Sequence, residues 1–90
     1  MTRPDERTRN LLQAGAYLKE LAASQAVPKA VRQEAYRLLR HYPTVSDVEA
    51  IAEHEERLRE LTQSAFVRPY LTRQIEPDWF RGYSLGPHRI

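Results

Sequence analysis

The sequence predicts an all-α protein. We expect a small three-helix bundle over residues 1–65, followed by an irregular tail over residues 66–90 that contains aromatic and arginine side chains. Apolar residues recur at helical spacings of three and four in three separate segments. A proline or a capping motif marks the start of each segment. After residue 66, prolines and glycines interrupt the chain too often for another long helix.

The first helix is predicted to end near Ser24. Thr2 and Asp5 have the spacing of a capping box, and Pro4 suits a first turn because its missing N–H has no helical partner there. Gly15 costs about 1 kcal/mol relative to alanine inside a helix, so we expect a close backbone approach at this position. The predicted buried stripe consists of Leu11, Ala14, Leu18 and Leu21.

The second helix is predicted to open at Pro28 and to end before Pro43. Helical periodicity between these two prolines indicates one apolar face. Its predicted buried stripe consists of Val31, Ala35, Leu38, Leu39 and Tyr42.

The third helix is predicted to begin at Asp47, because Ser46 and Glu49 have capping-box spacing. Its predicted stripe consists of Ile51, His54, Leu58, Leu61 and Ala65, with Val48 one turn earlier. We therefore expect His54 to lie within the bundle, where its protonation would lower stability as the pH falls from about 7.5 to 5.5.

Charge is unevenly distributed along the chain. The 14 basic and 12 acidic residues give a net charge of +2. Residues 1–45 carry eight basic and four acidic groups, residues 46–66 carry two and six, and residues 67–90 carry four and two. We therefore expect the acidic third helix to lie beside basic helices and to form exposed ion pairs, each worth less than about 1 kcal/mol.

The residue types that support common catalytic and metal sites are scarce. The chain has no cysteine, and its glycines at positions 15, 82 and 86 are too far apart for a phosphate-binding loop. No nucleophile elbow surrounds a serine, and the histidines and carboxylates lack metal-ligand spacing. We expect no enzymatic activity, catalytic residue, cofactor, metal ion or small-molecule substrate. Without a long apolar run or an apparent signal sequence, we expect a cytoplasmic protein that does not enter membranes.

The tail contains residue types that dominate protein interfaces. The protein-binding candidates are three aromatic residues and three nearby arginines: Trp79, Phe80, Tyr83, Arg68, Arg73 and Arg81. A second interpretation is that the tail is a strap, whose rings fold back over a thin core and bury about 150–250 Å² each. In that case the arginines remain outside.

The second helix presents a basic face. Lys29, Arg32, Tyr36 and Arg40 follow a spacing of 3, 4 and 4, which makes them candidates for phosphate contact. A helix-turn-helix over residues 28–63 is disfavoured, because its recognition helix would carry a net charge of −4 into the major groove.

The first half of the chain resembles a family of short uncharacterised proteins of the Burkholderia and Pseudomonas type. The resemblance covers residues 2–48. It rests on the Pro-x-Glu-Arg-Thr-Arg start at residue 4 and the Leu-Leu-Arg-His-Tyr-Pro helix end at residues 38–43, together with the segments around Tyr17–Leu21 and Pro28–Arg32. It implies a bacterial cytosolic accessory protein, in some cases from a phage or another mobile element, with no assigned reaction.

These observations predict a non-catalytic helical adaptor or modulator that binds another protein or self-associates. The first alternative is nucleic-acid association through the basic second helix. The second alternative is a mobile-element inhibitor that occupies a site on a host enzyme.

Overall fold

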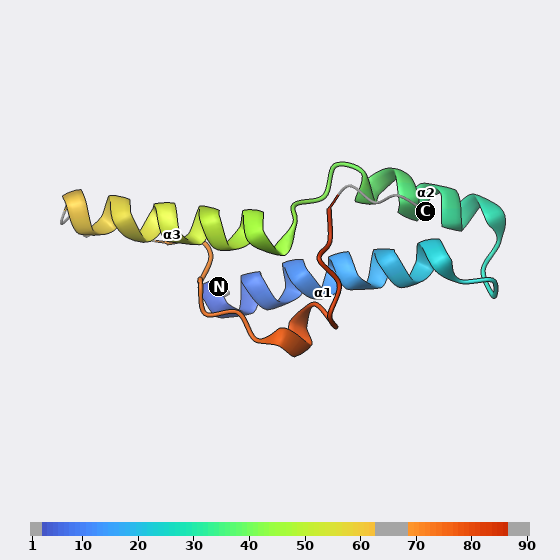
Figure 1. Ribbon diagram of the computed structural model, residues 1–90, viewed down its shortest axis with the longest axis horizontal. Coiled ribbons are helices and arrows are strands. Elements are labelled where there is room, and N and C mark those ends of the chain that lie inside the picture. The colour runs from blue at the N-terminus through green and yellow to red at the C-terminus, as the bar shows by residue number, and fades with distance from the viewer. Residues whose placement is uncertain (1–2, 63–68, 87–90) are drawn as a thin grey trace.

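The computed structural model of the protein describes residues 3–62 and 69–86. These residues form three α-helices, α1 (Pro4–Ala23), α2 (Lys29–Leu39) and α3 (Val45–Thr62), and one short 3-10 helix, η1 (Pro77–Trp79). No β-strand occurs in this described part of the chain. The predicted all-α fold is confirmed (Figure 1).

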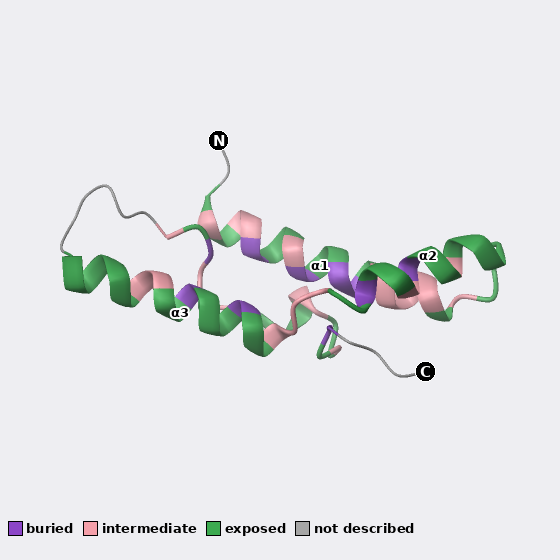
Figure 2. Ribbon diagram, turned by 90° about the horizontal axis from the view of Figure 1, so that it is seen from above, coloured by how far each residue is buried: buried purple, intermediate pink, exposed green. Residues whose placement is uncertain are grey.

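The helices form an elongated arrangement of 50 × 24 × 20 Å. α1 and α2 pack as an antiparallel hairpin. α3 then continues in the same direction as α2 and lies beside the first half of α1 (Figures 1 and 2). The acidic α3 therefore lies end to end with the basic α2, and the expected packing of the acidic helix on the basic second helix does not occur.

The start of α3 differs from the prediction by two residues. The amide of Asp47 donates to Thr44 Oγ1 at 3.0 Å, and the amide of Thr44 donates back to Asp47 Oδ2 at 3.0 Å. This reciprocal capping box places the first helical residue at Val45, whereas the Ser46–Glu49 motif predicted a start at Asp47.

The other helix boundaries also depend on local geometry. Pro28 is the residue immediately before α2, as its predicted role at the helix start requires. α1 begins after Arg3 without a side-chain cap, and the predicted cap Thr2 lies outside the described residues.

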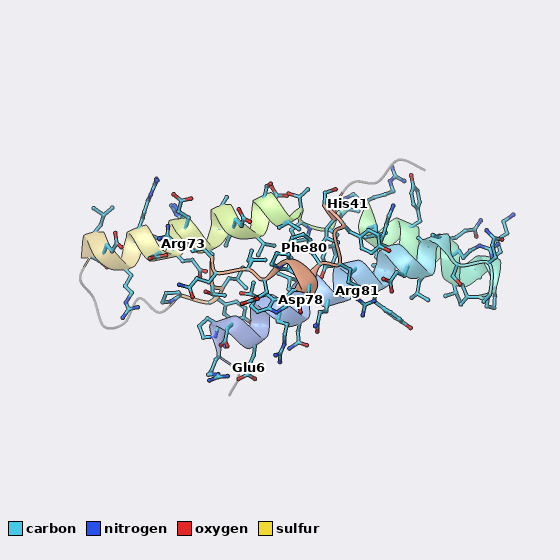
Figure 3. The ribbon with its side chains drawn as sticks, turned by 60° about the horizontal axis from the view of Figure 1, so that its bottom comes forward. Glu6, His41, Arg73, Asp78, Phe80 and Arg81 are labelled. Carbon is cyan, nitrogen blue, oxygen red and sulfur yellow. The ribbon has the colours of Figure 1, made fainter. Side chains whose placement is uncertain are left out.

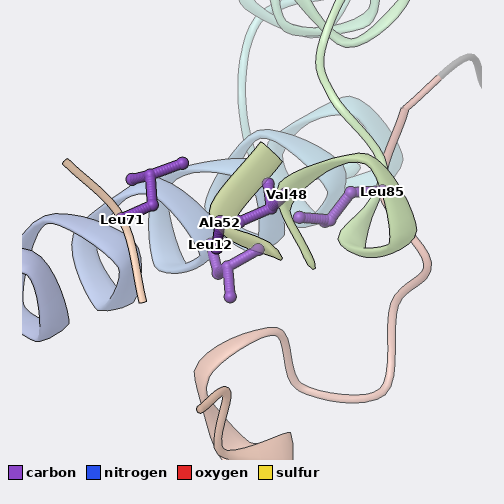
Figure 4. Packing of buried hydrophobic residues seen from close by; sticks show 5 residues of the cluster. All are labelled: Leu12, Val48, Ala52, Leu71 and Leu85. Carbon is purple, nitrogen blue, oxygen red and sulfur yellow. The ribbon is translucent and has the colours of Figure 1, made fainter. Parts of the chain in front are cut away.

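The central core joins two helices and the tail. Its buried side chains are Leu12, Val48, Ala52, Leu71 and Leu85 (Figure 4). α1, α3 and the segment after α3 therefore contribute to one cluster. The described tail packs on the helices, as the strap interpretation predicts.

The buried faces of the helices are rotated relative to the predicted stripes (Figure 2). The buried residues are Thr8, Leu12, Gly15 and Ala16 on α1, Ala35 and Leu39 on α2, and Val48 and Ala52 on α3. Many of these residues are small, so the backbones of neighbouring segments can approach closely. The large apolar residues of the predicted stripes lie mainly beside the contact.

Several predicted core positions are therefore wrong. The exposed members of the predicted stripes are Ala14, Val31, Leu38, Ile51, His54, Leu58 and Leu61. His54 is not an interface histidine, because it faces solvent. Leu11, Leu18, Leu21 and Tyr42 are partly buried, and Ala65 lies outside the described residues.

The predicted close approach at Gly15 is confirmed. A Cβ atom at this position would lie 2.6 Å from Cε1 of Tyr42 and 2.8 Å from Cδ1 of Leu85. The Tyr42 hydroxyl also donates to the carbonyl of Leu11, one turn earlier on α1. Gly15 thus lets Tyr42 of the α2–α3 connection and Leu85 of the tail reach the α1 backbone.

Hydrogen bonds hold residues 70–72 of the tail between α1 and α3. The buried hydroxyl of Thr8 donates to the Pro4 carbonyl at 2.8 Å and accepts from the amide of Thr72 at 2.9 Å. The Glu55 carboxylate accepts from the amides of Tyr70 and Leu71 at 2.9 and 3.0 Å. These contacts give the otherwise irregular tail a defined path.

Candidate protein-binding surface

An apolar groove lies between α1 and α2. It has a volume of about 340 Å³ and is lined by Leu18, Leu21, Ala30, Val31, Glu34, Ala35 and Leu38. Five of these residues belong to the stripes that were predicted to form the core. We name this feature the hairpin groove.

The rotation of α2 explains why the hairpin groove is open. Ala35 and Leu39 face α1 and are buried, so Val31 and Leu38 lie to one side of the contact. They remain 39% and 42% exposed. The groove is therefore bordered by large apolar side chains whose burial is incomplete.

The hairpin groove contains one charged side chain, Glu34. Arg37 donates to both carboxylate oxygens of Glu34 from the next turn of α2. This hydrogen bond lowers the pKa of Glu34 below its usual value and raises the pKa of Arg37. The pairing keeps the carboxylate charged and places a compensating cation next to it.

A second apolar surface lies on α3. Ile51 and Leu58 are 49% and 42% exposed, and Leu61 is 82% exposed. Ile51 precedes the buried Ala52 by one residue, just as Leu38 precedes the buried Leu39. In both helices, the apolar residue next to the buried position therefore stays exposed.

The aromatic protein-binding candidates of the tail are only partly exposed. Trp79, Phe80 and Tyr83 all pack against the central core. Figure 3 shows Phe80 next to η1, which lies close to α1. Their rings contribute part of their surface to the fold, so they do not form a freely projecting set of anchors.

The arginine candidates of the tail form ion pairs with the helices. Arg73 Nε lies 3.1 Å from Glu56 on α3, and Arg81 Nη1 lies 2.5 Å from Glu20 on α1. Both arginines are exposed, and Figure 3 shows them at separate places along the molecule. Hydrogen bonding to Glu20 raises the pKa of Arg81. Arg68 lies outside the described residues.

Three of the four phosphate-binding candidates lie together. Lys29, Arg32 and Tyr36 line a second hollow of about 270 Å³, together with Ala22 and Gln33. Arg32 also donates to the Val27 carbonyl at 2.8 Å, so its guanidinium helps to hold the α1–α2 connection. The fourth candidate, Arg40, is exposed but does not line this hollow.

Over residues 3–62 and 69–86, no group of three or more His, Asp or Glu side chains is arranged to hold a metal ion. None of the helices in these ranges is long and apolar enough to cross a membrane.

The hairpin groove could not be recognised as a binding surface from helical spacing. The spacing of Leu18, Leu21, Val31 and Leu38 predicts core positions. The small residues on the adjacent face of each helix, including Gly15 and Ala35, were a sign that this other face could be the buried one. Small residues at helix contacts leave larger side chains free to point elsewhere.

Comparisons of the chain with protein-family models, with curated proteins and with solved structures find no match. The family resemblance over residues 2–48 therefore stays a prediction.

Proposed function

We propose that this chain is a non-catalytic protein-binding module, an adaptor or modulator, that receives apolar side chains of a partner in the hairpin groove. The observation that carries this proposal is the groove itself, with six apolar residues and one ion-paired carboxylate in its lining. Exposed apolar surface of this kind favours the binding of an amphipathic protein segment.

Burial of the exposed surface of Val31 and Leu38 supplies a driving force for binding. Complete burial of a valine or leucine side chain contributes about 1.5–3 kcal/mol. Val31 and Leu38 retain about two fifths of their surface, so covering them contributes about 1 kcal/mol each. Leu18 and Leu21 add further contact area on the opposite wall of the groove.

Site-specific photocross-linking tests this proposal. A benzophenone amino acid at position 38 should cross-link to protein, both in the purified chain at high concentration and in a cell lysate. The matched control carries the same group at Tyr17, which is exposed on α1 but does not line the groove. Equal labelling from both positions, or no labelling from position 38, would contradict a binding role for the groove.

A second candidate function is phosphate contact by the basic face of α2. It is favoured by the shared hollow of Lys29, Arg32 and Tyr36. Binding to a nucleic acid through this face should weaken strongly as the salt concentration rises, because phosphate neutralisation releases counterions. Fluorescence anisotropy with a labelled duplex, compared between the parent chain and Lys29→Gln, measures this dependence. No salt-dependent binding would exclude the second candidate.

A further inference from the structure

The described tail forms two attachments, and each of them joins α1 to α3. At the first attachment, the amides of Tyr70 and Leu71 donate to the Glu55 carboxylate on α3 at 2.9 and 3.0 Å. The next amide, that of Thr72, donates to the Thr8 hydroxyl on α1 at 2.9 Å. Three consecutive tail amides therefore bridge the two helices, and the side chain of Leu71 is buried in the central core (Figure 4).

The second attachment lies at the other end of the described tail, beside the α2–α3 connection (Figure 1). The amide of Val45, the first residue of α3, donates to the Ser84 carbonyl at 2.9 Å. The next residue, Leu85, lies against α1, since a Cβ atom at Gly15 would be 2.8 Å from Leu85 Cδ1. This end of the tail therefore also connects the two helices.

Direct packing of α3 on the other helices is limited. α1 approaches α2 along much of their length and also approaches η1, whereas α3 comes close to no other described helix over a comparable stretch. The buried residues of α3 are Val48 and Ala52, and both lie in the first half of the helix. The position of α3 therefore depends on the tail and on the connection to α2.

The backbone of the second attachment is strained. Arg81 and Leu85 have φ angles of 51° and 61°, a left-handed conformation that is unfavourable for residues with a side chain. Leu85 is nevertheless buried, and Arg81 forms an ion pair with Glu20 on α1. These contacts hold the chain in a conformation that is relaxed once the tail detaches. Because strain opposes this attachment, we expect the tail to open before the helices unfold.

We propose that the tail is a clasp for α3: when the tail detaches, α3 swings away from α1 as a hinged arm, while the α1–α2 hairpin stays folded. The hinge lies between Tyr42, whose hydroxyl donates to the Leu11 carbonyl on α1, and Thr44, which caps α3. Opening exposes Leu12 and Val48, which the closed fold buries completely. The hairpin groove is lined by residues of α1 and α2, so it is present in both the closed and the open form.

Distances between spin labels test the hinged opening. The chain has no cysteine, so labels can be attached at exposed positions: Gln13→Cys with His54→Cys measures α1 to α3, and Gln13→Cys with Gln33→Cys measures α1 to α2. Glu55→Ala removes the acceptor of two tail amides. In this variant a population with a longer α1–α3 distance should grow, while the α1–α2 distance stays that of the parent. Glu49→Ala, a change of another glutamate on α3, is the matched control and should alter neither distance.

Hydrogen exchange under native conditions tests the opening in the parent chain. The amides of Val45, Leu71 and Thr72 are hydrogen-bonded at the two attachments. They should exchange about tenfold faster, or more, than the amides of Ala16 and Leu39 in the hairpin, because detachment of the clasp leaves the hairpin folded.

The Glu55→Ala variant also shows whether the two attachments open together. The amides of Thr72 and Val45 are not bonded to Glu55, so a purely local loss of hydrogen bonds would leave their exchange unchanged. Opening of the whole clasp should accelerate the exchange of both amides by about tenfold, the effect of losing hydrogen bonds to a charged group.

The outcomes distinguish a clasp from a tail that only completes the core. Lengthening of both label distances together, or equal exchange at the attachments and in the hairpin, would mean that the fold opens only as a whole and would overturn the hinged arm. An α1–α3 distance that Glu55→Ala leaves unchanged would also overturn it. These measurements do not probe the hairpin groove, so cross-linking at position 38 tests the proposed function separately.

Discussion

Replacing Leu12 by alanine should destabilise the fold more than alanine at an exposed position of the predicted α3 stripe, such as Leu58. Leu12 is fully buried among Val48, Ala52, Leu71 and Leu85. Removing a fully buried leucine side chain costs about 2–5 kcal/mol, because apolar contacts are lost and a cavity remains. Small domains have about 5–15 kcal/mol of total stability, so Leu12→Ala should remove a large fraction of it.

Thermal unfolding followed by circular dichroism measures this effect. Each kcal/mol of destabilisation should lower the melting temperature by about 4–8 °C in a domain of this size. The matched control is Leu58→Ala. Because Leu58 is 42% exposed, this variant should lose about 1 kcal/mol or less. Equal losses in the two variants would refute the assignment of the core to the Leu12 face.

Other predictions concern the tail and Tyr42. Thr8→Val preserves the side-chain shape but removes the acceptor for the Thr72 amide, so it should cost about 1–3 kcal/mol in urea unfolding; an unchanged midpoint would exclude a structural role for this bond. Joint replacement of Trp79 and Phe80 by alanine should lower the melting temperature, because both rings pack on the core; parent-like melting would contradict the strap interpretation. Burial raises the pKa of Tyr42, so the unfolded chain should ionise first and stability should fall as the pH rises through about 10. Tyr42→Phe should weaken this alkaline loss, and urea titrations between pH 9 and 11 would show whether it does.

The positions of the helices could largely be predicted from local chemistry. Pro28 introduces α2, and apolar periodicity identifies all three helical segments. The start of α3 was misplaced because Thr44 and Asp47 form the cap, while the neighbouring Ser46 and Glu49 have the same spacing. Two overlapping motifs with equal spacing cannot be distinguished without the backbone conformation.

The rotation of each helix could not be predicted from periodicity. Leu38 and Leu39 are adjacent leucines on α2, and both fit a helical stripe, yet only Leu39 is buried. On α3, the smaller Ala52 is buried and the larger Ile51 is exposed. Hydrophobic size favoured the wrong face, because close approach of neighbouring segments depends on small residues that carry little hydrophobic signal.

The candidate binding surface follows from this rotation. A large apolar residue becomes available to a partner only if the fold buries a different face of its helix. The packing of the tail helps to determine which helix face is buried, since Leu71 and Leu85 complete the core from positions far along the chain. Such long-range contacts leave no periodic pattern in the sequence.

The central claim is that the fold buries Leu12 and Leu39 and leaves Leu38 and Ile51 exposed. The solvent accessibility of individual methyl groups tests this claim most directly. NMR relaxation by a soluble gadolinium chelate should broaden the methyl signals of Leu38 and Ile51 in a dilute sample, while those of Leu12 and Leu39 stay protected. Protection of the Leu38 and Ile51 methyl signals, or broadening of those of Leu12 and Leu39, would contradict the assignment of the buried helix faces.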